Sequence, residues 1–383
     1  MAELVPAFRS RALAAEQAGR VPVENLVALR EAGLYRIVQP AMFGGYEHDF
    51  SVLADLVMEA AKGCPSTGWV YGLYAAHQWL VASFPEQAQH DVWGADPGAA
   101  LCGSYAPAGK AELVENGYKL NGRWRFASGC DGAQWAVCAS MLPPGADGKS
   151  AGPAFFLVPA IDYMIDGKWA TAGLGATGSK ALVLEDVFVP RHRMLTFRET
   201  TSGQTPGRAL HDNPGFGIPM LCQIPSCLAA TAVGAAAGAL DCYLDSTSNR
   251  VTRGAVAGGA NRMAEFSTIQ LRVAEAAASI DCARDLLIRD LSRRSAAARA
   301  GEEITVEDHI NSRRGQAFSV SLAIRAVDAL NASTGGYGLA LINPVQRAWR
   351  DANAVGRHIS LNWDSVGTMV GQMALGLEPK GQY

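Results

Sequence analysis

The sequence has little concentrated positive charge. Its 383 residues include 33 basic and 36 acidic side chains, for a formal net charge of −3, and no basic run is longer than a pair. Proteins that follow a phosphate backbone need a basic patch or stripe on one face. We therefore expect no nucleic-acid partner.

Cysteine pairs of the kind that bind metals are also missing. The eight cysteines are scattered along the chain, without a Cys-x-x-Cys pair or a histidine spacing that suits zinc. We interpret them as reduced, small core side chains, and we expect no metal.

Long apolar runs are scarce as well. The longest, residues 227–240, is rich in alanine and glycine and shorter than the ~20 residues that cross a bilayer. The first residues lack the basic and apolar segments of a secretion signal. We expect a soluble, cytoplasmic protein that does not associate with a membrane.

What the chain does contain is a sequence pattern that changes twice. Apolar residues recur at helical spacing in residues 1–97, short β-like runs separated by Gly, Pro and Asn fill residues 98–212, and helical spacing returns in residues 213–383. This order predicts an α+β fold with an N-terminal helical domain, a middle β-barrel-like domain and a C-terminal helical bundle.

Local signals predict particular elements within these parts. Asn121-Gly122 favours a two-residue hairpin turn, and Ser66 or Thr67 can cap a helix over residues 68–84. That helix would carry Trp69 and His77 about two turns apart on one face. A long helix is expected over residues 226–250, and Thr305, with an acidic residue three positions later, favours a capped start for a later helix.

A glycine-rich segment, Gly173-Leu174-Gly175-Ala176-Thr177-Gly178, matches the G-x-G-x-x-G pattern of dinucleotide sites. That fingerprint needs a helix directly after it, whereas residues 181–190 read as a strand that stops at a proline. We therefore reject a dinucleotide site and expect the chain to have no NAD(P)H-binding unit.

Several motifs, in the order of the three parts, resemble the acyl-CoA dehydrogenase superfamily over nearly the whole chain. The matching segments are Trp124-x-Phe126-x-Ser128-Gly129, residues 249–254 with Arg250, Gly335-Gly336-Tyr337-Gly338, and Pro344 with Arg350-Asp351-Ala352. Members with a glutamate base carry it shortly after the Arg-Asp pair, where this chain has Arg357-His358-Ile359-Ser360. Neither isoleucine nor serine can take an α-proton, which disfavours ordinary dehydrogenation unless the base lies on another helix.

The chain is more similar to the branch that forms the oxygenase components of two-component flavin monooxygenases, such as the 4-hydroxyphenylacetate and seco-steroid phenol hydroxylases. The segments that carry this likeness are residues 64–69, 84–94, 104–107, 128–131 and 357–364. The resemblance implies a dissociable reduced FAD or FMN, made by a separate NAD(P)H-flavin reductase, that reacts with O2 to a C4a-hydroperoxide and hydroxylates a small aromatic substrate. It also implies a homotetramer in which Gly335-Gly336 approaches the flavin of a neighbouring subunit.

Residue by residue, the resemblance also implies a site. It places the following residues around the flavin: Trp69, Ser104, Tyr105, Phe126, Ala127, Ser128, Arg250, Gly336 and Tyr337. It places His77 and His358 at the reaction pocket. Ser128 would stabilise the flavin adduct through N5, and His358 is the first candidate for the acid or base, because a pKa of ~6.5 suits either role.

Two positions depart from the phenol hydroxylases. Gly103 replaces a serine that meets the substrate hydroxyl, and Gly132 replaces a histidine. We expect a larger, less polar pocket, for which an indole or a fused aromatic competes with a phenol. An N- or S-oxygenase of the same fold and an acyl-CoA dehydrogenase-like flavoprotein remain alternative functions.

Overall fold

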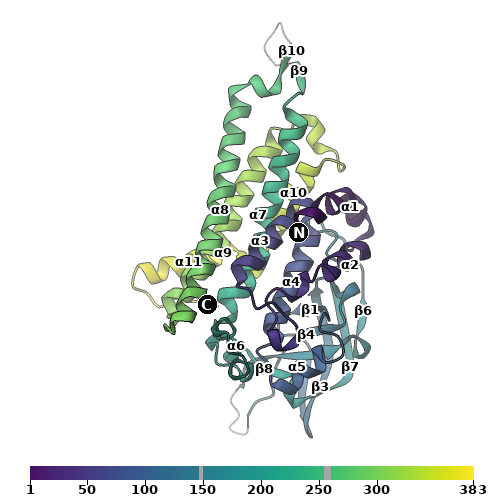
Figure 1. Cartoon of the computed structure of the whole chain (residues 1–383), viewed down its shortest axis with the longest axis vertical. Helices are drawn as coiled ribbons and strands as arrows, with labels where there is room; N and C mark the ends of the chain where they lie inside the picture. The colour runs from purple at the N-terminus through teal and green to yellow at the C-terminus, as the bar shows by residue number, and fades with distance from the viewer. Residues whose placement is uncertain (146–149, 254–259) are drawn as a thin grey trace.

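The computed structural model describes residues 1–145, 150–253 and 260–383. The chain begins with helices (Figure 1): α1 (Val5–Ala18), α2 (Val23–Glu31), α3 (Phe50–Gly63), α4 (Pro65–Val81) and α5 (Glu86–Trp93). Helix α4 is buried along nearly its whole length. It therefore forms the centre of this part of the molecule.

The predicted cap of α4 is wrong. The helix begins at Pro65, with Cys64 as its N-cap, because proline suits the first helical position. Ser66 and Thr67 lie inside the first turn and contact other segments instead: Ser66 Oγ accepts from the Ala176 backbone N–H at 3.2 Å, and Thr67 Oγ1 accepts from an asparagine of α2 at 3.1 Å.

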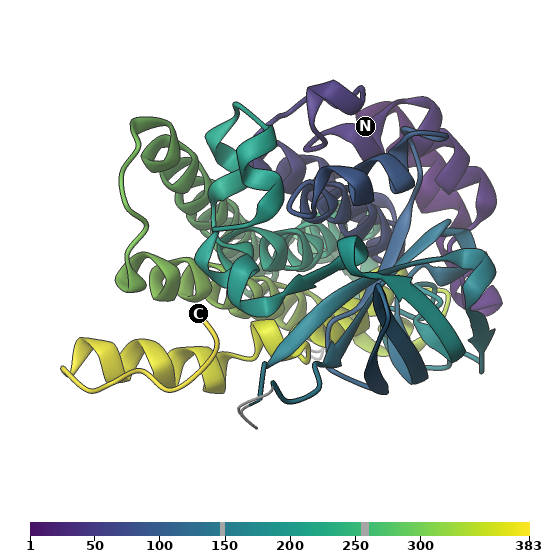
Figure 2. The same ribbon diagram turned by 90° about the horizontal axis from the view of Figure 1, so that it is seen from below.

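The middle of the chain forms two sheets that lie beside the helices (Figure 2). Their strands are β1 (Leu101–Ser104), β2 (Lys110–Val114), β3 (Gly117–Ala127), β4 (Trp135–Met141), β5 (Pro153–Pro159), β6 (Met164–Asp166), β7 (Lys180–Pro190) and β8 (Met194–Thr196). One sheet has the order β1-β4-β5-β8 and the other β2-β3-β7-β6. The β1–β4 pair is parallel, and the other pairs in these two sheets are antiparallel.

The hairpin predicted at Asn121-Gly122 is wrong. Strand β3 continues through both residues, and the register with β7 shifts between Leu120 and Gly122, which marks a β-bulge. The turn lies six residues earlier, at residues 115–116, between the paired residues Val114 and Gly117, and Asn116 has φ 63°. Residues 173–178 lead into β7 rather than into a helix, which agrees with the rejected dinucleotide site.

The last part is a bundle of long helices (Figure 1). Its elements are α7 (Met220–Thr247), the β9–β10 pair (Val251–Arg253 and Ala260–Arg262), α8 (Ser267–Ala300), α9 (Val306–Ala332), α10 (Pro344–Val355) and α11 (Trp363–Ala374). The short helix α6 (Phe197–Ser202) precedes the bundle and lies beside β8. The capping box of Thr305 and Asp308 at the start of α9 confirms that prediction.

Helix α7 is longer than the sequence predicts, because it begins at Met220 and continues through Pro225. It is long and apolar enough to cross a membrane by length and composition, but 89% of the relevant window is buried. Such burial is typical of a core helix. The α+β fold class is confirmed, whereas the domain boundaries at residues 97 and 212 stay a prediction.

Candidate active site

The end of β3 meets helix α4 at a buried polar contact. Trp69 Nε1, on α4, donates a hydrogen bond to Ser128 Oγ at 3.0 Å. Two residues before that serine, Phe126 has φ 65° and a side chain that is 66% exposed. An exposed aromatic in a strained conformation beside a buried hydroxyl is typical of a ligand site.

Ser128 is part of a chain of hydroxyl groups. Its Oγ lies 2.7 Å from Ser179 Oγ, which lies 2.6 Å from Thr177 Oγ1, and Thr177 donates to the Leu174 carbonyl at 2.9 Å. All three hydroxyl-bearing residues are buried. The sequence analysis missed Ser179 and Thr177, because only the fold brings residues 128 and 179 together.

His358 lies next to the same tryptophan. It follows α10, and its ring centroid lies 5.8 Å from that of Trp69. Its Nδ1 accepts from the Ser360 backbone N–H at 3.2 Å, so the neutral ring carries its proton on Nε2. Arg313, which the sequence analysis did not single out, donates to the Ser360 carbonyl at 2.6 Å and so fixes this turn.

His77 is held in the opposite tautomer. It is fully buried on α4, and its Nδ1 lies 2.6 Å from the Leu101 carbonyl, which can only accept a hydrogen bond. Its Nε2 is therefore an unprotonated acceptor, and it is buried without a partner. The hydroxyl of Tyr105, whose ring centroid lies 5.7 Å from that of His77, is also buried without a partner.

The ordinary pKa assumed for His358 from the sequence does not apply, and the pKa of His77 is lowered as well. Burial lowers the pKa of His77 to about 4, against a smaller opposite effect of its bond to Leu101. Burial, with the positive charge of Arg313 as a second cause, lowers the pKa of His358 to about 4. Both rings are neutral at pH 7, so each carries one proton on its two nitrogens. The hydrogen bond at Nδ1 therefore determines whether Nε2 is protonated, as in His358, or unprotonated, as in His77.

The two glycines that distinguish this chain do not leave open space. A Cβ at Gly103 would lie 3.0 Å from His77 Cε1 and 3.1 Å from Tyr105 Cε1, so the glycine lets these two rings approach the backbone. A Cβ at Gly132 would lie 2.6 Å from Leu26 Cδ1. The expectation of a pocket enlarged at both positions is therefore wrong: helix α2 fills the second position, and the His77 and Tyr105 rings fill the first.

The remaining predicted flavin residues separate into two groups. The first group lies at the end of β3 and includes Ser104, whose Oγ donates to the Arg125 carbonyl at 2.7 Å. The second group consists of Arg250, Gly336 and Tyr337. In it, Arg250 donates to the Thr334 carbonyl at 3.0 Å, and its guanidinium lies 5.8 Å from the Tyr337 ring centroid.

Helix α10 separates this second group from the histidine end of the site. Tyr337 and Gly336 precede the helix, and His358 follows it. Its 12 residues span about 18 Å. Within one subunit the second group is therefore remote from His358. Gly254, the last residue of the matched arginine motif, lies outside the described residues.

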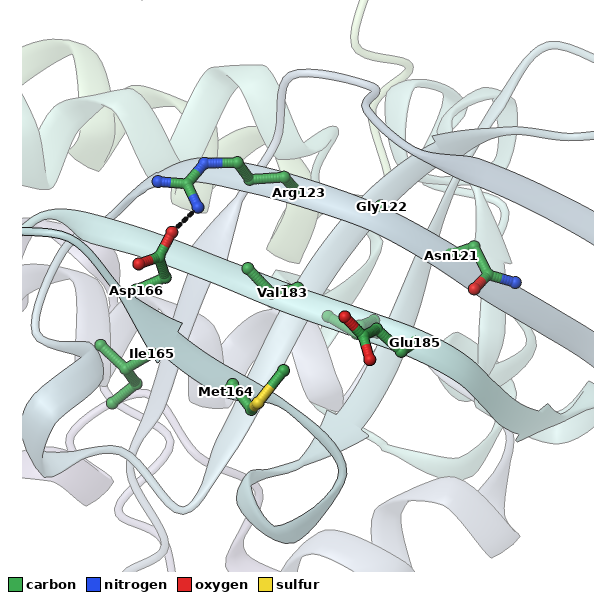
Figure 3. Close-up of a pocket in the computed structure, with 9 residues that line it drawn as sticks. Asn121, Gly122, Arg123, Met164, Ile165, Asp166, Val183 and Glu185 are labelled. Carbon is green, nitrogen blue, oxygen red and sulfur yellow. Dashed lines mark ion pairs between the residues drawn. The ribbon is translucent and has the colours of Figure 1, made fainter.

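A hollow of about 670 Å³ lies away from these residues, on the outer face of β3, β6 and β7 (Figure 3). It is lined by residues 121–123, 164–166 and 183–185, and Arg123 and Asp166 form an ion pair across it. None of the predicted site residues lines it. Gly122, at the bulge in β3, is one of the residues that line it.

Comparisons with known proteins agree with this architecture. Residues 226–363 match the family model described as acyl-CoA dehydrogenase, C-terminal domain. The crystal structure of a 3-HSA hydroxylase from Rhodococcus sp. RHA1 superimposes with a TM-score of 0.93 at 36% identity, covering 99% of this chain and 96% of that one. XiaF from Streptomyces sp., solved in complex with FADH2 and glycerol, gives a TM-score of 0.88 at 28% identity, covering 99% and 94%.

Curated relatives narrow the class. The chain is 59% identical over 381 residues to the oxygenase component of a FADH(2)-dependent resorcinol hydroxylase from Rhizobium sp., covering 98% of this chain and 93% of the relative. It is 38% identical over 374 residues to the flavin-dependent monooxygenase oxygenase subunit HsaA from Rhodococcus jostii, covering 98% and 97%.

The fold and the site define an acyl-CoA dehydrogenase-like flavoprotein. Within that superfamily, the chain belongs to the family of oxygenase components of two-component flavin-dependent monooxygenases. It is the enzyme class predicted from the sequence, an oxygenase that hydroxylates an aromatic substrate with reduced flavin supplied by a separate component.

Proposed function

We propose that this chain hydroxylates a small phenol of the resorcinol class. The observation that carries the proposal is that Nε2 of His77 and the hydroxyl of Tyr105, two of the buried polar atoms without a partner among the described residues, belong to neighbouring rings. Buried polar groups are almost always paired, so these two atoms indicate a polar ligand. A dihydroxybenzene has two hydroxyls to offer them, and a relative with 59% identity is named for resorcinol.

The residues at the end of β3 suit a reduced flavin. Phe126 offers an exposed aromatic face, and Ser128 Oγ keeps a free lone pair after its bonds to Trp69 and Ser179. Ala127 is the small residue between them. When bound, reduced flavin supplies the two electrons with which one atom of O2 enters the substrate and the other leaves as water.

The two histidines then have different roles. Nε2 of His77 accepts a hydrogen bond from a substrate hydroxyl, which increases the electron density of the ring that is to be hydroxylated. The Tyr105 hydroxyl contacts the second substrate hydroxyl and fixes the orientation of the ring. His358 faces Trp69 and offers the N–H of Nε2 as a hydrogen-bond donor on the flavin side. Burial of these groups keeps water away from the reduced flavin.

The second group of flavin residues acts on a neighbouring subunit in this proposal. Arg250, Gly336 and Tyr337 lie together beyond the far end of α10, next to apolar side chains that are more than half exposed. The exposed side chains are Tyr337, Leu339, Leu341 and Ile342. A homotetramer covers such a surface, and light scattering that reports a stable monomer at micromolar concentration would contradict it. We place the enzyme in the cytoplasm, with a separate NAD(P)H-flavin reductase.

The substrate is tested with chemically reduced FAD, O2 and a panel of resorcinol, phenol, indole and a fused polycyclic aromatic. We expect hydroxylated product and little H2O2 with resorcinol, and mainly H2O2 with indole and the polycycle. Efficient hydroxylation of indole or the polycycle, with resorcinol inert, would contradict the proposed substrate class.

A further inference from the structure

The hydroxyl chain beside Ser128 has a fixed direction. A carbonyl oxygen cannot donate, so the bond from Thr177 to Leu174 uses the only proton of the Thr177 hydroxyl. Ser179 must then donate to Thr177. For the same reason, Ser128 must donate its proton to Ser179.

The end of this chain is anchored firmly. The Leu174 carbonyl also accepts from Trp169 Nε1 at 2.9 Å and from the Thr177 backbone N–H at 3.2 Å. The Leu174 N–H donates to Asp351 Oδ1 at 2.6 Å, and Leu174 has φ 52°. Because the peptide groups on both sides of Leu174 are held by hydrogen bonds, the carbonyl is fixed in place and the hydroxyl chain keeps its direction.

The hydroxyl of Ser128 already makes two hydrogen bonds: its oxygen accepts from Trp69, and its proton is donated to Ser179. Toward a further ligand atom it therefore has only a lone pair available. Ser128, Ser179 and Thr177 are all buried, which leaves water little access to replace these bonds. Ser128 is therefore a hydrogen-bond acceptor toward whatever lies against the end of β3.

We propose that Ser179, by accepting the proton of Ser128, makes the flavin site select the reduced cofactor over the oxidised one. The inference rests on the proposed function, in which Ser128 meets flavin N5. Reduced flavin carries a hydrogen on N5 and can donate to the serine, whereas oxidised flavin has a lone pair on N5 that would face the serine's lone pair. Ser179 contacts the flavin only through Ser128, so it is a positioning residue.

The measured quantity is the ratio of the dissociation constants of oxidised and reduced FAD, each titrated into the apo-protein, the reduced form under anaerobic conditions. Ser179→Ala leaves the Ser128 proton free to bond oxidised N5, so oxidised FAD should bind about 3- to 10-fold more tightly while reduced FAD changes little. The midpoint potential of bound FAD should fall by about 15–30 mV, since a tenfold change corresponds to about 30 mV for two electrons. Neither readout requires turnover.

Three variants complete the design. Ser179→Thr keeps a hydroxyl and should restore the wild-type ratio. Thr177→Val removes the acceptor for Ser179 and should shift the ratio in the same direction as Ser179→Ala, which provides a second route if the first variant does not fold. Ser140→Ala is the matched control, because Ser140 is a buried serine on β4 whose hydroxyl donates to the Ala108 carbonyl, and it should leave the ratio unchanged.

Ser128→Ala distinguishes a wrong placement of the flavin from a wrong role of Ser179. If it leaves the affinities for both forms of FAD unchanged, the proposed placement of the flavin is wrong. If it weakens reduced FAD but Ser179→Ala and Thr177→Val both keep the wild-type ratio and potential, the flavin placement stands and the role of Ser179 is overturned.

Discussion

The Nε2 atoms of His77 and His358 have opposite hydrogen-bonding roles. The Leu101 carbonyl accepts from Nδ1 of His77, which leaves Nε2 as an acceptor, whereas Nδ1 of His358 accepts from the Ser360 N–H, which leaves Nε2 as a donor. Because both rings are neutral at pH 7, their backbone partners determine these roles. The candidate active site thus has one acceptor and one donor made from the same side-chain type.

His77→Asn tests the acceptor. The asparagine amide can still donate to the Leu101 carbonyl near the position of Nδ1, but Nε2 is lost. We expect weaker phenol binding and a fall of about 10²–10⁴-fold in product formation, while reduced flavin is still oxidised and H2O2 accumulates. Single-turnover product analysis measures this. His211→Asn, at a buried histidine that contacts Gln89, is the matched control and should behave as wild type.

His358→Asn tests the donor. The amide oxygen can still accept from the Ser360 N–H, so the turn should persist without the donor at Nε2. We expect substrate affinity to remain near wild type while the product formed per reduced flavin falls and H2O2 rises. Equilibrium titration with resorcinol and product quantification separate the two effects. A variant that hydroxylates at the wild-type rate across pH 6 to 9 would remove His358 from catalysis.

The depressed histidine pKa values predict a particular pH dependence. An ordinary histidine would give an inflection near pH ~6.5, whereas His77 and His358 should leave product formation flat from about pH 6 to 8 and give an acid limb near pH 4. The free energy of unfolding should depend on pH over the same acidic range. The unfolded histidines take up protons below about pH 6.5 and the folded ones do not, so the stabilisation present above that pH is lost as pH falls toward 4.

Urea unfolding of wild type and His77→Asn between about pH 4 and 7 measures the contribution of one ring. The wild-type protein should lose more stability than the variant as pH falls through this window. Equal slopes for the two proteins, or a rate inflection near pH 6.5 that disappears in His77→Asn, would show that the His77 pKa is not depressed.

Gly103→Ala and Gly132→Ala should differ in kind. A Cβ at position 103 crowds the His77 and Tyr105 rings, so we expect lower product yield and higher KM for the phenol with flavin oxidation retained. A Cβ at position 132 meets Leu26 Cδ1 at 2.6 Å, so we expect a loss of about 1–3 kcal/mol in stability with near-normal coupling of the folded fraction. Thermal unfolding and H2O2 assays on both variants check this contrast, and a reversal of the two results would contradict the assignment.

The sequence predicts the fold well where the signal is local. The capping box at Thr305 and the strand ending at Pro190 are examples, because the residues that decide them are neighbours in the chain. The hairpin fails because the chain contains two Asn-Gly pairs, at 116–117 and 121–122, and either suits a turn. In the structure the turn consists of Glu115 and Asn116, so only the asparagine of the first pair lies in it. Pairing with β7 places the second pair at a bulge, and this is a tertiary effect.

For the candidate site, too, the sequence predicts individual residues but not the contacts that tertiary packing creates. Motifs identify Ser128 and the two histidines, but Ser179 is 51 residues from Ser128 in the chain, and only the packing of β7 against β3 brings their hydroxyls together. Nor can a sequence indicate that both histidines lose their ordinary pKa values, since burial by residues from several elements causes the shift. The tautomers likewise depend on backbone atoms of β1 and of the turn after α10.

The most direct test of the account is one turnover with isotopic oxygen. The purified chain, without a reductase and without NAD(P)H, is mixed anaerobically with chemically reduced FAD and resorcinol and then exposed to ¹⁸O2. We predict a hydroxylated product that carries one ¹⁸O atom, in an amount close to that of the reduced FAD supplied. Oxidation of FAD that yields only H2O2, or a product whose new oxygen comes from water, would contradict the assignment of this chain as a phenol-hydroxylating oxygenase component.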